Sequence, residues 1–418
     1  MTRLLLPEAF GLMAMVAAIN FVALLLSDIG IRQAVVQSVR GDEATMLDTA
    51  WTLQIARGFI VWCGCSLVAV GLYVARTSGA LPPDSVYGAP ALPALLAAAT
   101  FSSVVAGFAS TKLYTADRQL QQGRVAIIEI ISQSVGLLLM GVAAWATQSV
   151  WALVVGGWAS VTVSVVLSHA WLPGVSNRLQ WDAACAREII LFGRWILLSS
   201  LLWGLAANGD RLMLGAWVNP TVLGQYAIAA TLAMMVEAAA GRIFGAVATP
   251  AFSDVVRRDP RRLREVYLRM RVSFDFAFVG AAGLLFSTGQ WIVDLLYDAR
   301  YAPAGAILQI LSFSLVFTRY GLVASAYLAV GAPKYLTAIH FVKVVSLFVS
   351  VPAAYSLAGN QGAYWAVALH LLPTLPLIAW FNSRHGLNSW FPEAVAAIAW
   401  PVGYGTGLLF LQFLAWLR

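Results

Sequence analysis

PEAFGLMA at Pro7–Ala14 returns later in the chain as PTVLGQYA at Pro220–Ala227. Both segments read Pro-x-x-(Phe/Leu)-Gly-x-(Met/Tyr)-Ala, and each leads into a long apolar run. Two further matches keep nearly the same spacing: Ser110–Leu113 with Ser325–Leu328, and Trp151-Ala152 with Trp365-Ala366. Repeated matches at one spacing indicate a duplicated unit, which in a membrane protein is typical of a transporter with two lobes.

The composition is that of a membrane protein. Hydrophobic residues make up 60% of the chain, charged residues 11%, and the mean hydropathy is +0.79. A soluble domain carries about 25% charged residues. Apolar runs long enough to cross about 30 Å of hydrocarbon occur near residues 9–27, 51–75, 91–113, 125–147, 149–171, 188–208, 223–247, 269–293, 305–330, 336–358, 361–381 and 393–417. We therefore predict an all-α polytopic membrane protein with about 12 transmembrane helices.

The duplication predicts how these helices are grouped. Six spans separate the two motifs, and because an even number preserves direction, the two lobes are expected to be parallel and pseudo-symmetric. The second motif follows a full span whereas the first follows only 1–6, so the first lobe is expected to lack its first helix. The expected domains are an N-terminal helical lobe of five spans (1–172), a cytoplasmic linker (173–187), a C-terminal lobe of six spans (188–384) and an additional C-terminal span (385–418).

Basic residues predict which side faces the cytoplasm. Most Lys and Arg fall in loops on one side of the twelve-span arrangement, and the positive-inside rule assigns that side to the cytoplasm. Its most basic segment is RRDPRRLREVYLRMR at 257–271, in which apolar residues recur at helical spacing. We expect this segment to lie on the anionic leaflet as an amphipathic helix.

No motif for bond-making chemistry is present. The sequence has no Gly-x-x-x-x-Gly-Lys-(Ser/Thr) loop for ATP, no His-Glu-x-x-His and no nucleophile elbow. The three cysteines and four histidines show no spacing typical of metal ligands. We therefore expect no enzyme activity, no catalytic residue, no metal, no cofactor and no nucleic-acid partner.

Three stretches resemble one family: RLLLPEAFGLMAMV from Arg3, LLLSDIGIRQAVVQ from Leu24, and FGRWILLSSL…NGDRLMLGAWVNPTVLGQYAIA from Phe192. They look like the Wzx-type polysaccharide and O-antigen flippases of the multidrug/oligosaccharidyl-lipid/polysaccharide exporter superfamily. The resemblance runs from Arg3 to about Ser383. In the family's register, the helices of this chain correspond to the second to thirteenth.

The resemblance implies a function and a location. It implies translocation of undecaprenyl-diphosphate-linked oligosaccharide repeat units across the bacterial inner membrane, for O-antigen or exopolysaccharide synthesis, by alternating access of the two lobes. The implied partners are the lipid-linked oligosaccharide, membrane lipids, and a polysaccharide polymerase and glycosyltransferases. Two alternatives remain open: a cation-coupled drug exporter of the same superfamily, and a non-transporting scaffold of a polysaccharide assembly complex.

Charged residues inside the spans are the candidate site residues. At the bilayer centre a charged side chain costs about 3 kcal/mol or more, so it normally faces a cavity or a partner. Guanidinium groups bind phosphate oxygens in pairs, and the implied cargo carries a diphosphate. The hypothetical substrate-binding residues are Arg242, Arg319, Arg57 and Arg194. Salt bridges or snorkelling to the headgroups are the structural alternatives.

A second set of charged residues is assigned to coupling or gating. These residues are Glu129, Lys343, Glu237 and Asp275. Lys343 and Glu129 occupy nearly equivalent positions in the two repeats, so opposite charges are expected at matching depth. They could form a gate between the lobes or a fixed ion pair.

Overall fold

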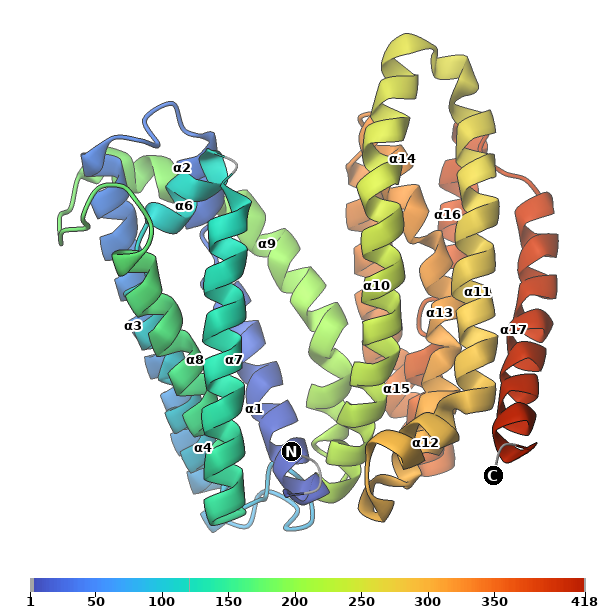
Figure 1. Cartoon of the computed structure of the whole chain (residues 1–418), viewed down its shortest axis with the longest axis horizontal. Helices are drawn as coiled ribbons and strands as arrows, with labels where there is room; N and C mark the ends of the chain where they lie inside the picture. The colour runs from blue at the N-terminus through green and yellow to red at the C-terminus, as the bar shows by residue number, and fades with distance from the viewer. Residues whose placement is uncertain (1–3, 120, 417–418) are drawn as a thin grey trace. The chain divides into compact units, whose positions relative to one another are not determined.

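The computed structural model describes residues 4–119 and 121–416, apart from the side chains of residues 192–199, 240, 243, 244 and 246. Within these residues every element of regular structure is a helix (Figure 1). The chain packs into two compact units, Met1–Leu223 and Gly224–Arg418. The all-α fold predicted from the sequence is confirmed.

The first unit holds nine α-helices of the described part of the chain. They are α1 (Pro7–Leu26), α2 (Ile31–Gln37), α3 (Ala44–Thr77), α4 (Leu92–Thr100), α5 (Ser102–Gly107), α6 (Lys112–Arg118), α7 (Gln122–Thr147), α8 (Trp151–Ala170) and α9 (Ala183–Leu214). The segment from α4 to α6 is one broken span, bent by 65° between Leu92–Gly107 and Lys112–Arg118. Proline at the start of α1 fits because the first helical N–H has no intrahelical acceptor.

The second unit is built mainly from long helices. Its elements are α10 (Pro220–Arg258, which starts four residues before the unit), η1 (Pro260–Arg262), α11 (Leu263–Leu296), η2 (Ala299–Tyr301), α12 (Pro303–Ser312), α13 (Ser314–Thr318), η3 (Arg319–Gly321), α14 (Leu322–Ala329), α15 (Lys334–Leu369), α16 (Thr374–Arg384) and α17 (Phe391–Trp416). As in the first unit, the third span is broken, here into α12, α13, η3 and α14. This shared interruption supports the duplication read from the sequence.

The described helices have the length and hydropathy of a multi-pass membrane protein. Nine are long and apolar enough to cross a bilayer, or up to ten if the bent α4–α6 segment counts as one span. Among these nine, α15 and α16 together count as one segment, Lys334–Arg384. The backbone of α15 leaves helical geometry at Ala358 and Gly359, between the predicted spans 336–358 and 361–381. Every predicted span coincides with a helical segment.

Close helix packing in both units depends on glycine. In the second unit α11 and α17 lie side by side (Figure 1), and a Cβ atom added to Gly403 would lie 2.0 Å from the carbonyl oxygen of Gly280. In the first unit α7 packs on α8, and a Cβ atom on Gly156 would lie 2.5 Å from the Cβ atom of Met140. Small residues of this kind let helix backbones approach within a membrane, where no hydrophobic effect drives helices together.

Two features differ from the sequence expectations. The structure groups α9 with the first unit, where Cys185, Ala186 and Ile189 join the buried cluster of α2 and α3, whereas the boundary expected at 173–187 puts this helix in the second lobe. The prediction of a surface helix at 257–271 is wrong. Instead α10 continues to Arg258, a 3₁₀ turn capped by Asp259 follows, and α11 runs on from Leu263.

Candidate functional site

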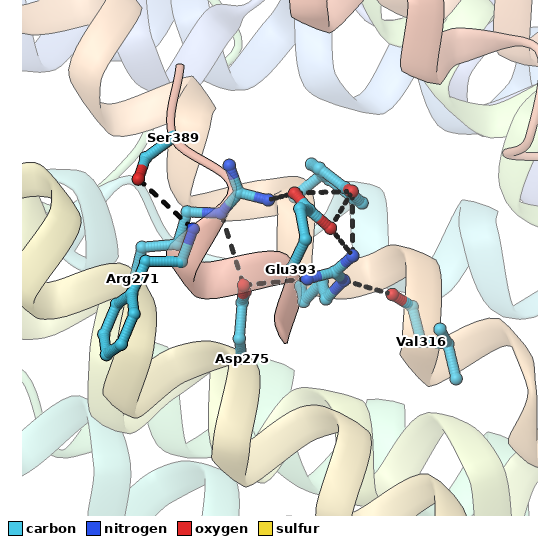
Figure 2. A network of polar contacts seen from close by, with 8 residues as sticks. Arg271, Asp275, Val316, Ser389 and Glu393 are labelled. Atoms are coloured by element: carbon cyan, nitrogen blue, oxygen red, sulfur yellow. Dashed lines mark hydrogen bonds and ion pairs between the residues drawn. The ribbon is translucent and has the colours of Figure 1, made fainter. Parts of the chain in front are cut away.

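The second unit contains a buried network of four charged side chains and one tyrosine (Figure 2). Arg271 and Asp275 lie one turn apart on α11, so both face the same side of the helix. Arg319 and Tyr320 come from η3, which contacts α11. Glu393 comes from the first turn of α17. The network therefore joins three segments that are far apart in sequence.

Each charge in the network has at least two polar contacts. Arg319 donates to Asp275 from Nη1 at 2.8 Å, to Glu393 from Nη2, and to the carbonyl oxygen of Val316 from Nε at 3.0 Å. Arg271 approaches Asp275 with its Nε at 3.3 Å and donates to Glu393 from Nη2. Both guanidinium groups also lie over the ring of Tyr320, at 4.7 and 4.5 Å from its centroid.

The four charges differ sharply in their exposure. The side chains of Arg271, Arg319 and Asp275 are 4%, 8% and 0% exposed, whereas Glu393 is 43% exposed. Removing one partner from such a group leaves a buried charge uncompensated, which typically costs about 3–5 kcal/mol. Two cations and two carboxylates cancel, so the network as a whole is neutral. Glu393 is the member that water can reach.

A cavity of about 500 Å³ opens beside the network. Arg271, Tyr320 and Glu393 form one wall of it. The other lining residues come from α16, from the loop that follows and from the start of α17: Leu375, Ile378, Ala379, Asn382, Asn388, Ser389 and Trp390. The cavity thus combines charged, amide, hydroxyl and indole groups, and its loop belongs to the face assigned to the cytoplasm by the positive-inside rule.

A second cavity, of about 430 Å³ and mostly apolar in its lining, lies between α10, α11 and the broken span. Arg242 and Glu237 of α10 line it together with Thr318 and Ser325. Glu237 and Thr318 also line a neighbouring cavity of about 170 Å³, which contains Lys343. Three of the sequence-predicted residues, Arg242, Glu237 and Lys343, are thereby brought to two adjoining cavities within one unit.

In the first unit Arg57 of α3 contacts the end of α1. Its guanidinium donates to the carbonyl oxygen of Leu24 at 2.8 Å and to the hydroxyl of Ser27 at 3.1 Å, and it lies 3.7 Å from Asp28. Arg57 also lines two cavities, a polar one of about 360 Å³ and an apolar one of about 720 Å³. The carbonyl groups at a helix C-terminus favour a nearby cation, which gives Arg57 a structural reason for its position.

Glu129 and Arg194 are two further sequence-predicted residues. Glu129 is exposed on α7 in the first unit, and Lys343 belongs to the second unit, so the suggested Lys343–Glu129 relation stays a prediction. The side chain of Arg194 lies outside the described residues. Arg319 and Asp275, which the sequence assigned to separate roles, belong to one network.

Sequence reasoning missed Tyr320 and two of the four charged members of the network. Arg271 was assigned to the basic surface segment, although its i, i+4 spacing to Asp275 places both on one helix face. Glu393 lies at the edge of the last predicted span, where a carboxylate ordinarily reaches water. The spacing signal was available for Arg271, whereas no local signal joins Glu393 to α11.

Comparisons with known proteins give a matching family and several structures of similar fold. Residues 1–306 match the model of a family described as "Polysaccharide biosynthesis protein". No curated protein matches the sequence significantly.

Several solved structures share the fold over nearly the whole chain. An inward-facing multidrug resistance MATE family transporter of the MOP superfamily aligns with a TM-score of 0.69 at 12% identity, covering 91% of each chain. The lipid II flippase MurJ, in an inward closed conformation, aligns with a TM-score of 0.59 at 9% identity, covering 98% of each. The eukaryotic MATE transporter AtDTX14 aligns with a TM-score of 0.55 at 14% identity, covering 93% of this chain and 87% of that one. At these identities the likeness establishes the fold alone: a polytopic transporter fold.

Proposed function

We propose, from the premise that this chain belongs to the polysaccharide biosynthesis protein family, that it flips lipid-linked oligosaccharide repeat units across the bacterial inner membrane. The cargo is an undecaprenyl-diphosphate-linked sugar, and the mechanism is alternating access of the two lobes. The observation that carries the proposal is the cavity of about 430 Å³ in the second unit, with the guanidinium of Arg242 and the carboxylate of Glu237 on an otherwise largely apolar wall.

The physical reason is the cost of placing charge in a bilayer. An arginine in a span is tolerated where it faces water or a partner. Arg242 lines the cavity, and its planar fork of donors matches the oxygens of a phosphate. A single guanidinium binds a diphosphate more weakly than a cage of several cations would, and a flippase must release its cargo.

Glu237 is suited to coupling because it lines both adjoining cavities. It shares the larger one with Arg242 and the smaller one with Lys343 and His340. Protonation or cation binding at Glu237 would change the net charge next to Arg242 and so alter the affinity for an anionic cargo. We assign Glu237 and Lys343 to coupling, and Arg242 to the cargo.

The test is flipping in cells that lack their own flippase. Lipid-linked oligosaccharide in the outer leaflet is measured for the wild type, Arg242→Ala and Arg258→Ala. Arg258 is the matched control, since it lies on the same helix but is exposed and paired with Asp254. We expect the wild type and Arg258→Ala to restore flipping and Arg242→Ala to lose at least tenfold.

Other outcomes select the rival functions. If the wild type restores no flipping but the chain still co-purifies with a polymerase or glycosyltransferase, it acts as a scaffold. If it exports organic cations instead, and Glu237→Gln abolishes that export, it is a cation-coupled drug exporter. Normal flipping by Arg242→Ala would remove this residue from the site.

A further inference from the structure

We propose that Arg271, Arg319 and Tyr320 form a second phosphate site, and that Glu393 of α17 occupies it until the diphosphate of the cargo displaces it. This inference rests on the proposed function, because it takes the same cargo, but it concerns a separate set of residues. The network of Figure 2 is then an anion site occupied by the carboxylate of Glu393, and not a fixed set of structural ion pairs.

The donors converge on the carboxylate of Glu393 as they would on a phosphate. Arg271 Nη2 donates to Oε1 and Arg319 Nη2 donates to Oε2. The hydroxyl of Tyr320 lies 3.1 and 3.0 Å from the same two oxygens. Two guanidinium groups and a phenol, aimed at one point from two helical segments, are a strong donor set for an oxyanion.

The difference between the two carboxylates shows which one can leave. Asp275 is fully buried beneath both arginines and keeps them in place, whereas Glu393 is 43% exposed. With Glu393 bound the group is neutral, and without it two guanidinium groups and one carboxylate leave a net charge of one positive unit. The diphosphate of the cargo is esterified at both ends, so each of its two phosphates carries one negative charge, and together they offer more charge and more acceptor oxygens to the two guanidinium groups than a single carboxylate does.

The adjoining cavity of about 500 Å³ offers room for the sugar attached to the phosphate. Its amide and hydroxyl groups, from Asn382, Asn388 and Ser389, are donors and acceptors of the kind that sugar hydroxyls need. The indole of Trp390 adds an apolar face. Arg271, Tyr320 and Glu393 line the same cavity, so a diphosphate at the arginines would place its sugar there.

Displacement of Glu393 would also release the start of α17. Glu393 is in the first turn of this helix, and its ion pairs join that turn to α11 and η3. Beyond Pro401, Gly403 packs directly on α11. Ala396 and Ala399 pack on Val279 of α11, so the part released is the first turn of α17, which precedes this contact and carries Glu393.

The experiment measures binding of inorganic pyrophosphate to the full chain in nanodiscs. Wild type, Glu393→Gln, Arg319→Gln and Glu265→Gln are compared. Glu265 is the control carboxylate, since it is exposed on α11 and pairs with the exposed Arg262 and Arg269. We expect Glu393→Gln to bind about tenfold more tightly, a change of about 1.4 kcal/mol, Arg319→Gln to lose binding, and Glu265→Gln to match the wild type.

A second measurement avoids the risk that Arg319→Gln fails to fold. In the wild type, pyrophosphate is expected to speed hydrogen exchange at residues 391–400. Equal affinity of Glu393→Gln and wild type, or unchanged exchange at 391–400, overturns the inference. Loss of flipping by Arg242→Ala alongside either of those results would leave the proposed function intact. A chain that binds pyrophosphate as expected but flips no lipid would overturn the proposed function alone.

Discussion

Replacing Gly403 by alanine is expected to force α17 away from α11. A Cβ atom at this position would lie 2.0 Å from the carbonyl oxygen of Gly280 and 2.9 Å from its Cα atom. Both are backbone atoms of the facing helix, so no side-chain rotation can make room. Ordinary van der Waals contact begins near 3.4 Å, and the helices must therefore separate locally by about 1.4 Å.

The energetic cost follows from that displacement. Overpacking of a tight interface typically costs about 1–3 kcal/mol, and here it also removes contacts along the rest of the α11–α17 interface. Alanine favours a helix over glycine by about 1 kcal/mol, which offsets part of this cost. We expect Gly403→Ala to lower the free energy of unfolding by up to about 2 kcal/mol, and to be about 1–3 kcal/mol less stable than a glycine-to-alanine change on the same helix that meets no clash.

The chain supplies a matched control on the same helix. Gly405 has nothing within 4 Å of an added Cβ atom, so Gly405→Ala gains helix propensity without a clash and should be at least as stable as the wild type. Both variants are unfolded in mixed micelles and followed by tryptophan fluorescence. Equal stability of Gly403→Ala and Gly405→Ala would refute the close approach of α11 and α17.

Three further predictions concern other parts of the chain. Gly156→Ala, but not Gly157→Ala, should lower the thermal unfolding temperature, because only the first added Cβ meets another atom within 4 Å; equal temperatures would contradict this. Gly359 has φ +56° and ψ −143°, so Gly359→Ala should cost about 1–3 kcal/mol of unfolding free energy, and an unchanged value would argue against the break in α15. Asp182 caps α9: the N–H of Cys185 donates to its carboxylate and holds the pKa of this carboxyl below its usual value. The cap therefore stabilises α9 at pH values above the unfolded-state pKa of Asp182, and this stabilisation is lost as pH falls through the folded-state pKa. Hydrogen exchange at the start of α9, corrected for intrinsic rates, should therefore rise on acidification in the wild type but be high at both pH values in Asp182→Ala; a pH-independent wild type would contradict it.

The helices could be predicted because their signals are local. Each apolar run is long enough to span a bilayer, and a backbone in lipid must satisfy its hydrogen bonds within the segment, so a helix follows directly. The break between residues 358 and 361 also has a local cause, because Gly359 adopts a backbone conformation that other residues avoid. The prediction of a surface helix at 257–271 was wrong because apolar residues recur at the same helical spacing in a surface helix and at the ends of two long helices.

The candidate site was predicted only in part. Arg319 and Asp275 were identified because a charge in a span is costly wherever it points. Their connection to each other, and to Arg271 and Glu393, depends on how η3 and α17 pack on α11. Arg242 and Glu237 lie on one helix but five residues apart, about 140° around its axis, so their shared cavity also depends on the neighbouring helices.

The sequence by itself determined the membrane class, the duplication, the positions of the spans and the costly charges within them, because each depends on composition or on short spacings. Only the tertiary structure decided which charges meet. Ion pairing and cavity formation require atoms from distant segments to lie within a few ångströms, and that proximity is set by helix packing at positions such as Gly403. The same packing brings Glu393 onto two buried arginines and so joins charges that are far apart in sequence into one network.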